Sequence, residues 1–135
     1  MDMKKPILLS AICAIVLMAA SCKKETDPRV HPSLTFKTGS GYVAVNDTVA
    51  QQDTLKIGAV IDKTEDPLIS LNITRTYDTD PSVSLQDVSL AGNEHFEYDF
   101  QLITRAQAGL ERYTFSVLDR DGNITTKTIA LTVTP

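Results

Sequence analysis

Residues 113–133 read YTFSVLDRDGNITTKTIALTV, and this stretch decides the fold. Apolar side chains stand at every second position over residues 113–117, and they do so again over residues 129–133. Alternation with a period of two places one face of a β-strand in a core and the other face in water. Between the two runs lies the step Asp121-Gly122, and glycine accepts the positive φ of a tight reversal without steric cost. The stretch therefore predicts a β-hairpin.

The same period of two recurs upstream, in residues 55–61, 69–73 and 96–102. No window of a dozen residues shows the apolar stripe of an amphipathic helix. Turn-forming runs, such as residues 62–67 and 76–81, separate the alternating segments. Short strands with turn-rich connections predict an all-β sandwich or barrel of about seven strands, with helical content close to nil. At this chain length we expect one folded domain, over residues 33–135.

Residues 109–133 also resemble the last two strands of bacterial immunoglobulin-like domains. Those domains commonly have a glycine, a tyrosine, alternating apolar residues, an Asp-x-x-Gly-Asn turn and a closing strand rich in threonine. Here the glycine is Gly109, the tyrosine is Tyr113 and the turn is residues 119–123. The resemblance implies an antiparallel immunoglobulin-like sandwich in which Tyr113 is a corner tyrosine, its hydroxyl tied to nearby backbone. Fold alone does not transfer function.

The first 21 residues differ from everything that follows. A short charged head, Asp2, Lys4 and Lys5, precedes an uncharged and mostly apolar run over residues 7–20. A bilayer span needs about 20 apolar residues, whereas the core of a signal peptide needs about 7–15. The run length and the small residues that close it predict a signal peptide over residues 1–21. A short membrane anchor or a buried helix is the alternative.

The sequence Ala19-Ala20-Ser21-Cys22 resembles the lipobox of bacterial lipoproteins. The resemblance implies that the Cys22 thiol accepts a diacylglyceryl group and that Cys22 becomes the new N-terminus. Two or more acyl chains hold a protein stably on a membrane, whereas a single chain holds it marginally. Ala19 departs from the leucine most common at its position. The alternative is a secreted protein with an incidental cysteine.

Residues 22–32 are polar and charged and contain two prolines, which predicts a flexible tether between lipid and domain. The start of this segment, SCKKE at residues 21–25, resembles surface lipoproteins of the Bacteroides group, although Thr26 splits its acidic residues. The resemblance implies a lipid anchor in the outer membrane, with the cell surface favoured over the periplasmic face. Cys13 lies in the leader and Cys22 carries lipid, so the domain should have no disulfide.

Three oxygen-bearing side chains follow one another at alternate positions in the predicted turn: Asp119, Asp121 and Asn123. Calcium loops use such spacing, but they place their glycine later and add a distant bidentate glutamate, and both features are missing here. A turn is the favoured interpretation, with these residues as weak metal candidates. No cofactor is expected.

Candidate catalytic groups are sparse. Glu94, Glu97 and Asp99 offer paired carboxylates of the kind that glycosidases use, but nothing in the sequence raises their pKa. His31 and His95 lie far apart, and their spacing indicates neither a metal pair nor a nucleophile with its base. No phosphate-binding loop or zinc-protease motif is present. The sequence does not predict an enzyme.

Two threonines and two tyrosines complete the candidates. Thr48 and Thr54 lie in Asp-Thr-aliphatic triplets, which resemble the O-glycosylation pattern of the Bacteroides group and make both residues candidate sugar acceptors. Tyr42 and Tyr77 are the aromatic residues not assigned to the core, so they are candidate ligand-facing side chains. A net charge of −4 argues against nucleic acid as a partner.

These features favour a non-catalytic, lipid-anchored structural or interaction module whose partner is an envelope protein or a carbohydrate. The alternative is a glycan-binding accessory subunit of an outer-membrane nutrient-uptake complex. Glycan binding usually uses exposed aromatic platforms, and the chain has no tryptophan. Tyr42 and Tyr77 on one exposed face would favour the alternative.

Overall fold

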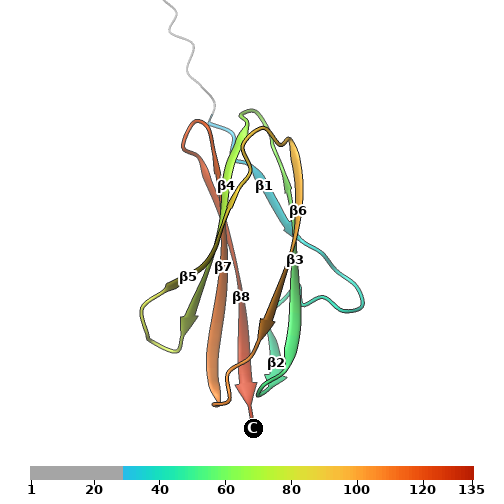
Figure 1. The fold of residues 1–135 in the computed structure, drawn as a ribbon, viewed down its shortest axis with the longest axis vertical. Coiled ribbons are helices and arrows are strands. Elements are labelled where there is room, and N and C mark those ends of the chain that lie inside the picture. The colour runs from blue at the N-terminus through green and yellow to red at the C-terminus, as the bar shows by residue number, and fades with distance from the viewer. Residues whose placement is uncertain (1–28) are drawn as a thin grey trace, which may run out of the picture.

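The computed structural model describes residues 29–135, and these form two packed β-sheets with no helix (Figure 1). The predicted signal peptide and Cys22 lie outside the described residues. Nothing in the described part is a helix long and apolar enough to cross a membrane. The strands are β1 (Ser33–Phe36), β2 (Asp47–Ala50), β3 (Thr54–Asp62), β4 (Leu68–Tyr77), β5 (Val83–Ser89), β6 (His95–Ile103), β7 (Gly109–Asp119) and β8 (Ile124–Thr134).

The two sheets have the strand order of an immunoglobulin-like sandwich. Three antiparallel strands form one sheet in the order β1-β3-β6, and five form the other in the order β2-β8-β7-β4-β5. In the larger sheet β2 is parallel to β8, and the other neighbours are antiparallel. Strands β1, β3 and β6 take the places of immunoglobulin strands A, B and E, and β4, β7 and β8 those of C, F and G. The predicted fold class is confirmed, with eight strands.

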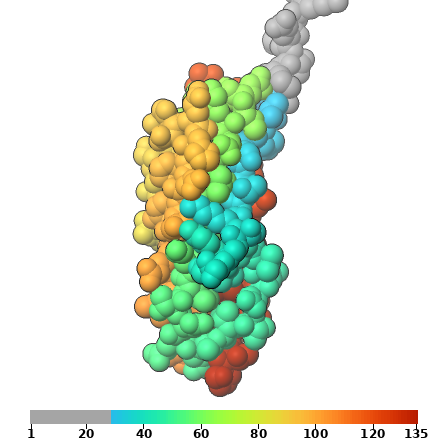
Figure 2. Space-filling view, turned by 90° about the vertical axis from the view of Figure 1, so that its right-hand side faces the viewer, coloured from blue at the N-terminus to red at the C-terminus, as the bar shows by residue number. Residues whose placement is uncertain are grey.

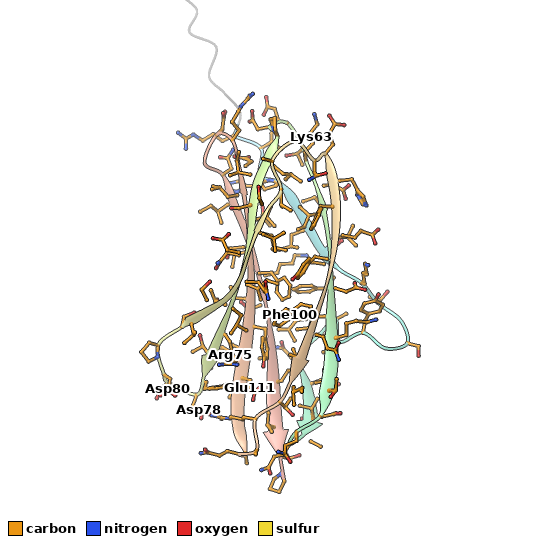
Figure 3. All side chains as sticks on the ribbon, in the orientation of Figure 1. Lys63, Arg75, Asp78, Asp80, Phe100 and Glu111 are labelled. Carbon is orange, nitrogen blue, oxygen red and sulfur yellow. The ribbon has the colours of Figure 1, made fainter. Side chains whose placement is uncertain are left out.

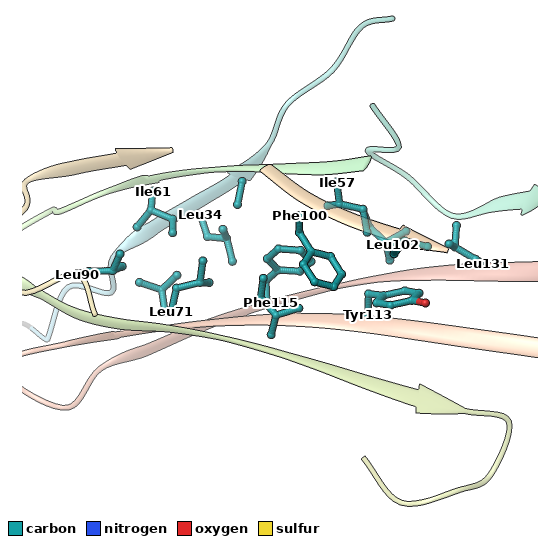
Figure 4. Close-up of a cluster of buried hydrophobic side chains, with 14 of the residues drawn as sticks. Leu34, Ile57, Ile61, Leu71, Leu90, Phe100, Leu102, Tyr113, Phe115 and Leu131 are labelled. Atoms are coloured by element: carbon teal, nitrogen blue, oxygen red, sulfur yellow. The ribbon is translucent and has the colours of Figure 1, made fainter. Parts of the chain in front are cut away.

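The core lies where the inward-facing side chains of the two sheets meet (Figure 4). Phe115 of β7 is fully buried, and its ring meets Phe36 edge-on at 5.2 Å and Phe100 at 6.2 Å between centroids. Edge-to-face packing of this kind suits the charge distribution of aromatic rings. Fully buried aliphatic side chains from both sheets surround these rings: Ile57, Ala59, Ile61, Leu71, Ile73, Val117 and Leu131. The period of two seen over residues 113–117 is thus the inner face of β7.

The predicted hairpin is confirmed. Strands β7 and β8 pair without a break from Gly109 opposite Val133 to Leu118 opposite Ile124. The reversal between them contains Gly122 at a φ of 84°. Because an unbroken register keeps every inward side chain on one face, this hairpin supplies much of the core.

The chain enters the domain at the end that carries the β7–β8 turn. His31 Nδ1 donates to the Ile124 carbonyl at 3.0 Å, and Thr125 Oγ1 donates to the Pro32 carbonyl at 2.6 Å. The sequence interpretation placed His31 and Pro32 in the flexible tether of residues 22–32. The structure instead seats these two residues on the sandwich, at the pole opposite the C-terminus (Figure 1).

The β4–β5 hairpin leaves the sandwich at its lower end. Strand β5 pairs with β4 and with no other described strand, and its register slips between Ile73 and Thr74. Gln86 faces Ile73 and Ser84 faces Thr74, so Leu85 is the extra residue of a β-bulge. In Figure 1 the hairpin turns away from the three-stranded sheet, and most of β5 is exposed.

Candidate interaction surfaces

A loop over residues 37–46 lies across the outer face of the three-stranded sheet (Figure 2). Gly58 of β3 makes room for it, because a Cβ at this position would stand 2.6 Å from Lys37 Cδ and 2.7 Å from Tyr42 Cε1. The backbone joins the two segments, since Lys37 N donates to the Gly58 carbonyl at 2.8 Å. The missing side chain at Gly58 thus lets Tyr42 lie on the sheet.

Tyr42 is half-buried and its polar groups are in use. Its hydroxyl donates to Asp99 at 3.0 Å, and Lys56 Nζ lies 4.5 Å from the ring centroid, within cation–π range. Lys37 Nζ lies 2.9 Å from both Glu97 and Asp99. Hydrogen bonds from Lys37 lower the pKa of each of these carboxyls. Glu97 and Asp99 therefore share Lys37 as their ion-pair partner.

His95 extends this network toward the end where the chain enters. Its Nδ1 lies 2.6 Å from Asp62 and its Nε2 lies 3.4 Å from Glu97. The hydrogen bond to Asp62, followed by that to Glu97, raises the pKa of His95 above 6.5. The protonated ring is therefore favoured in the folded state.

We expect His95→Gln to destabilise the domain in acid and to leave its stability unchanged in mild base. A raised folded-state pKa contributes stability that is fully present below the unfolded pKa, about 6.5, and that is lost as pH rises through the folded pKa. Denaturant unfolding of wild type and variant between about pH 5.5 and 9 measures this. A gap between the two proteins that widens with rising pH would contradict the assignment.

Tyr77 lies on the other sheet, at the end of β4 (Figure 3 labels its neighbours Arg75 and Asp78). Two guanidinium groups lie over its ring, with Arg75 Cζ at 4.2 Å and Arg105 Cζ at 4.7 Å from the centroid. Arg105 Nη2 also forms an ion pair with Asp78 at 2.6 Å. Tyr77 is therefore covered by cations rather than presented as an open platform.

Glu111 is a fully buried acidic residue near the end of the domain that carries the C-terminus. Its carboxylate accepts the Tyr113 hydroxyl at 2.7 Å and the backbone N–H of Arg105 at 2.8 Å. The resemblance implied a direct bond from Tyr113 to backbone; that expectation was wrong, because the Glu111 carboxylate stands between them. Burial, and then the bond to Glu111, raises the pKa of Tyr113.

Asp78, in the turn between β4 and β5, also belongs to the cluster around Glu111, Arg105 and Tyr113. Its carboxylate accepts the backbone N–H of Leu110 at 2.8 Å, and this bond, followed by the one from Arg105, lowers its pKa. Gly109 has a φ of 150°, and a Cβ there would contact the Arg105 guanidinium and stand 2.6 Å from Asp78 Oδ1. The glycine of the family pattern is thus the position that admits the Arg105–Asp78 pair.

The predicted turn over residues 119–123 uses its oxygens internally. Asp119 is buried and accepts both the backbone N–H and the side-chain amide of Asn123, at 2.8 and 2.9 Å. Asp121 Oδ1 lies 3.9 Å from Arg120 Nε. Across residues 29–135, no three metal-ligating side chains come together. The structure thus joins Asp119 to Asn123 as turn partners.

The carboxylates considered for glycoside hydrolysis are ion-paired. Glu94 lies 2.8 Å from Lys63, which lowers its pKa, and Glu97 and Asp99 share Lys37. A general acid in such a site needs a raised pKa, so these shifts have the wrong sign for that role. No pocket is found among the described residues.

The remaining candidates do not converge. Tyr42 lies on the three-stranded sheet and Tyr77 on the five-stranded sheet, so the structure does not bring them together. Thr48 in β2 and Thr54 at the start of β3 are both exposed. The sequence interpretation missed Glu111, and its only sign there was a charged residue in an alternating run, on the same face as Tyr113.

No protein-family model and no curated protein matches this chain. Among solved structures it is similar to the superoxide reductase (neelaredoxin) from Ignicoccus hospitalis, with 10% identity, a TM-score of 0.48, and coverage of 78% of this chain and 81% of that one. It is also similar to the CARDB domain of PF1109 from Pyrococcus furiosus, with 14% identity, a TM-score of 0.45, and coverage of 76% of this chain and 96% of that one. The similarity to murine CRIg has 17% identity, a TM-score of 0.42, and coverage of 78% of this chain and 100% of that one. At these identities and TM-scores, the similarities assign no activity to the chain.

Proposed function

We propose that this chain is a non-catalytic structural or interaction module held at the outer membrane by lipid on Cys22, with its domain at the cell surface. The observation that carries the proposal is the docking of His31 and Pro32 on one pole of the sandwich. Seven residues lead from Cys22 to Arg29, and an extended chain spans at most about 3.6 Å per residue, or roughly 25 Å. The anchored pole would stay near the lipid and the opposite pole would face away.

The pairing of the surface charges supports an interaction role over catalysis. Glu97 and Asp99 of the three-stranded sheet form ion pairs with Lys37, and Glu94, just before β6, forms one with Lys63; their lowered pKa values keep these carboxylates ionised. Such groups recognise a partner by charge and shape, whereas acid–base catalysis at neutral pH needs groups that exchange protons there.

The rival function, a glycan-binding subunit of a nutrient-uptake complex, needs an aromatic platform. Tyr42 and Tyr77 lie on different sheets, and cations lie over both rings. A stacking sugar would have to displace Lys56 from Tyr42, or Arg75 or Arg105 from Tyr77. This arrangement favours a protein partner over a stacked sugar.

Anchoring is tested by expressing the full chain in bacteria with labelled palmitate. We expect wild type to take up label, Cys22→Ala to take up none, and Cys13→Ala, the matched control, to be labelled like wild type. Label in Cys22→Ala, or none in wild type, would remove the anchor from the proposal. Protease treatment of intact cells then tests placement: cleavage supports the cell surface, and a labelled but resistant protein would place the domain on the periplasmic face.

A further inference from the structure

The three-stranded sheet ends in a long free edge. Immunoglobulin sandwiches of the constant type carry a fourth strand, D, beside strand E. Here β6 holds the place of E and pairs with β3 alone among the described strands. The nine β3–β6 pairs run without a register shift from Thr54 opposite Ile103 to Asp62 opposite His95. The other edge of β6 therefore presents a regular row of backbone groups.

The other sheet edges are less suited to receiving a strand. Strands β1 and β2 have four residues each, and β5 is interrupted by the bulge at Leu85. Short edges and bulged edges are the devices by which proteins discourage edge pairing. Strand β6 is both long and regular.

The inner side chains of β6 are apolar and incompletely covered. Phe96 and Tyr98 are half-buried and stack on each other, with centroids 6.4 Å apart and an interplanar angle of 17°. On β5, at the border of the five-stranded sheet, Leu85 and Val88 are also half-buried against the core. An added strand at the D position would bring its inward side chains between these two apolar borders.

Arg75 of β4, on the five-stranded sheet, is a cation without a carboxylate partner, and it lies nearer the C-terminal pole than Phe96 and Tyr98 do. Arg75 is level with Tyr113 in the sheet register, and the Tyr113 ring lies 6.1 Å from Phe100 of β6. The Arg75 guanidinium lies over the ring of Tyr77. Within residues 29–135, Arg105 and Arg120 pair with carboxylates, whereas no ion pair holds Arg75. An acidic side chain on an added strand would complement it.

We propose that the free edge of β6 accepts an extended acidic segment of a partner protein as the missing fourth strand. The inward side chains of this partner segment are apolar where they lie beside Phe96 and Tyr98, and acidic at the level of Arg75. A polypeptide fits better than an acidic glycan, because only a polypeptide can continue the backbone ladder while alternating its side chains between two faces. The proposal deepens the interaction role and rests on it, but it does not require the lipid anchor.

The test uses the full chain in detergent micelles and a peptide matched in length to residues 96–102 of β6. The peptide has glutamate at the third position, valine at the fifth and seventh, and threonine at the others, so that these three side chains lie opposite Phe100, Tyr98 and Phe96 on the inner face. Antiparallel pairing puts its glutamate at the level of Arg75. We expect saturating peptide to slow amide hydrogen exchange along β6, as seen by NMR.

Two variants and a second peptide test whether the Arg75 charge attracts the glutamate of the peptide. Arg75→Gln should weaken binding about tenfold, the effect of losing one charge-assisted hydrogen bond, while Lys127→Gln on β8 should leave it unchanged. Replacing the glutamate of the peptide by lysine should weaken binding to wild type equally. Slowed exchange in β5 or β2 instead of β6, or equal binding by Arg75→Gln, would overturn the proposal. So would protection of β6 by dextran sulfate but not by the peptide.

The two proposals can fail separately. Palmitate labelling in cells reports the anchor and is indifferent to the β6 edge, whereas the exchange experiment on the purified chain is indifferent to Cys22. Failure to bind the peptide in a chain that is labelled would remove the strand-addition site and leave the anchored module.

Discussion

Glu111→Ala should lower the free energy of unfolding by about 3–5 kcal/mol, the usual result of removing one partner from a buried charge network. The carboxylate is completely buried and satisfies two donors, the Tyr113 hydroxyl and the Arg105 backbone N–H. Without it, both donors remain buried with no acceptor, and Arg105 Nε, which already has no hydrogen bond, loses the Glu111 oxygen that lies 3.8 Å away. Denaturant unfolding monitored by circular dichroism measures the change.

Two further variants separate this network from general effects of charge removal. Glu65→Ala removes an exposed carboxylate and should change stability by about 0.5 kcal/mol or less. Glu111→Gln keeps one oxygen acceptor and should cost less than Glu111→Ala. Equal stability of Glu111→Ala and wild type would mean that the carboxylate does not bridge Tyr113 to the backbone.

Phe115→Ala should lower the free energy of unfolding by about 3–5 kcal/mol, the range for deleting a buried aromatic side chain. Phe115 of the five-stranded sheet is fully buried, and its ring contacts two rings of the facing three-stranded sheet, Phe36 of β1 and Phe100 of β6. Its removal opens a cavity where the two sheets meet, and rigid strands on both sides limit collapse.

Thermal and denaturant unfolding check the Phe115 prediction. Lys127→Ala is the matched control, because Lys127 faces Phe115 across the β7–β8 pair but is exposed. We expect it to change stability by about 0.5 kcal/mol or less. A loss below about 1 kcal/mol for Phe115→Ala would mean that the two sheets do not close over this ring.

The fold could be predicted from the sequence because burial leaves a local pattern. In β6 the alternation of His95, Glu97 and Asp99 with Phe96 and Tyr98 gives both the strand and its inner face. The Asp-Gly step gives the β7–β8 turn, because the preference of glycine for positive φ is a property of the residue itself. Such signals need no knowledge of distant neighbours.

The surfaces could not be predicted in the same way, because they depend on pairs far apart in the chain. Lys37 meets Asp99 only after β1 and β6 have both paired with β3. Gly58 falls in an alternating run and gives no hint that a loop will lie on it. The docking of His31 on Ile124 joins residues 93 positions apart, so the composition of the tether suggested only flexibility.

The opposite placement of the two chain ends has a mechanical consequence. The described chain enters beside the β7–β8 turn and leaves at the far pole, after β8, whose last residues run parallel to β2 (Figure 1). Tension applied between these ends acts along the strands, and ladder hydrogen bonds that lie across the strands are then loaded together in shear. Stretching the domain between these ends would require several bonds to break at once, so the sandwich should resist force along this axis more than force that peels one strand away.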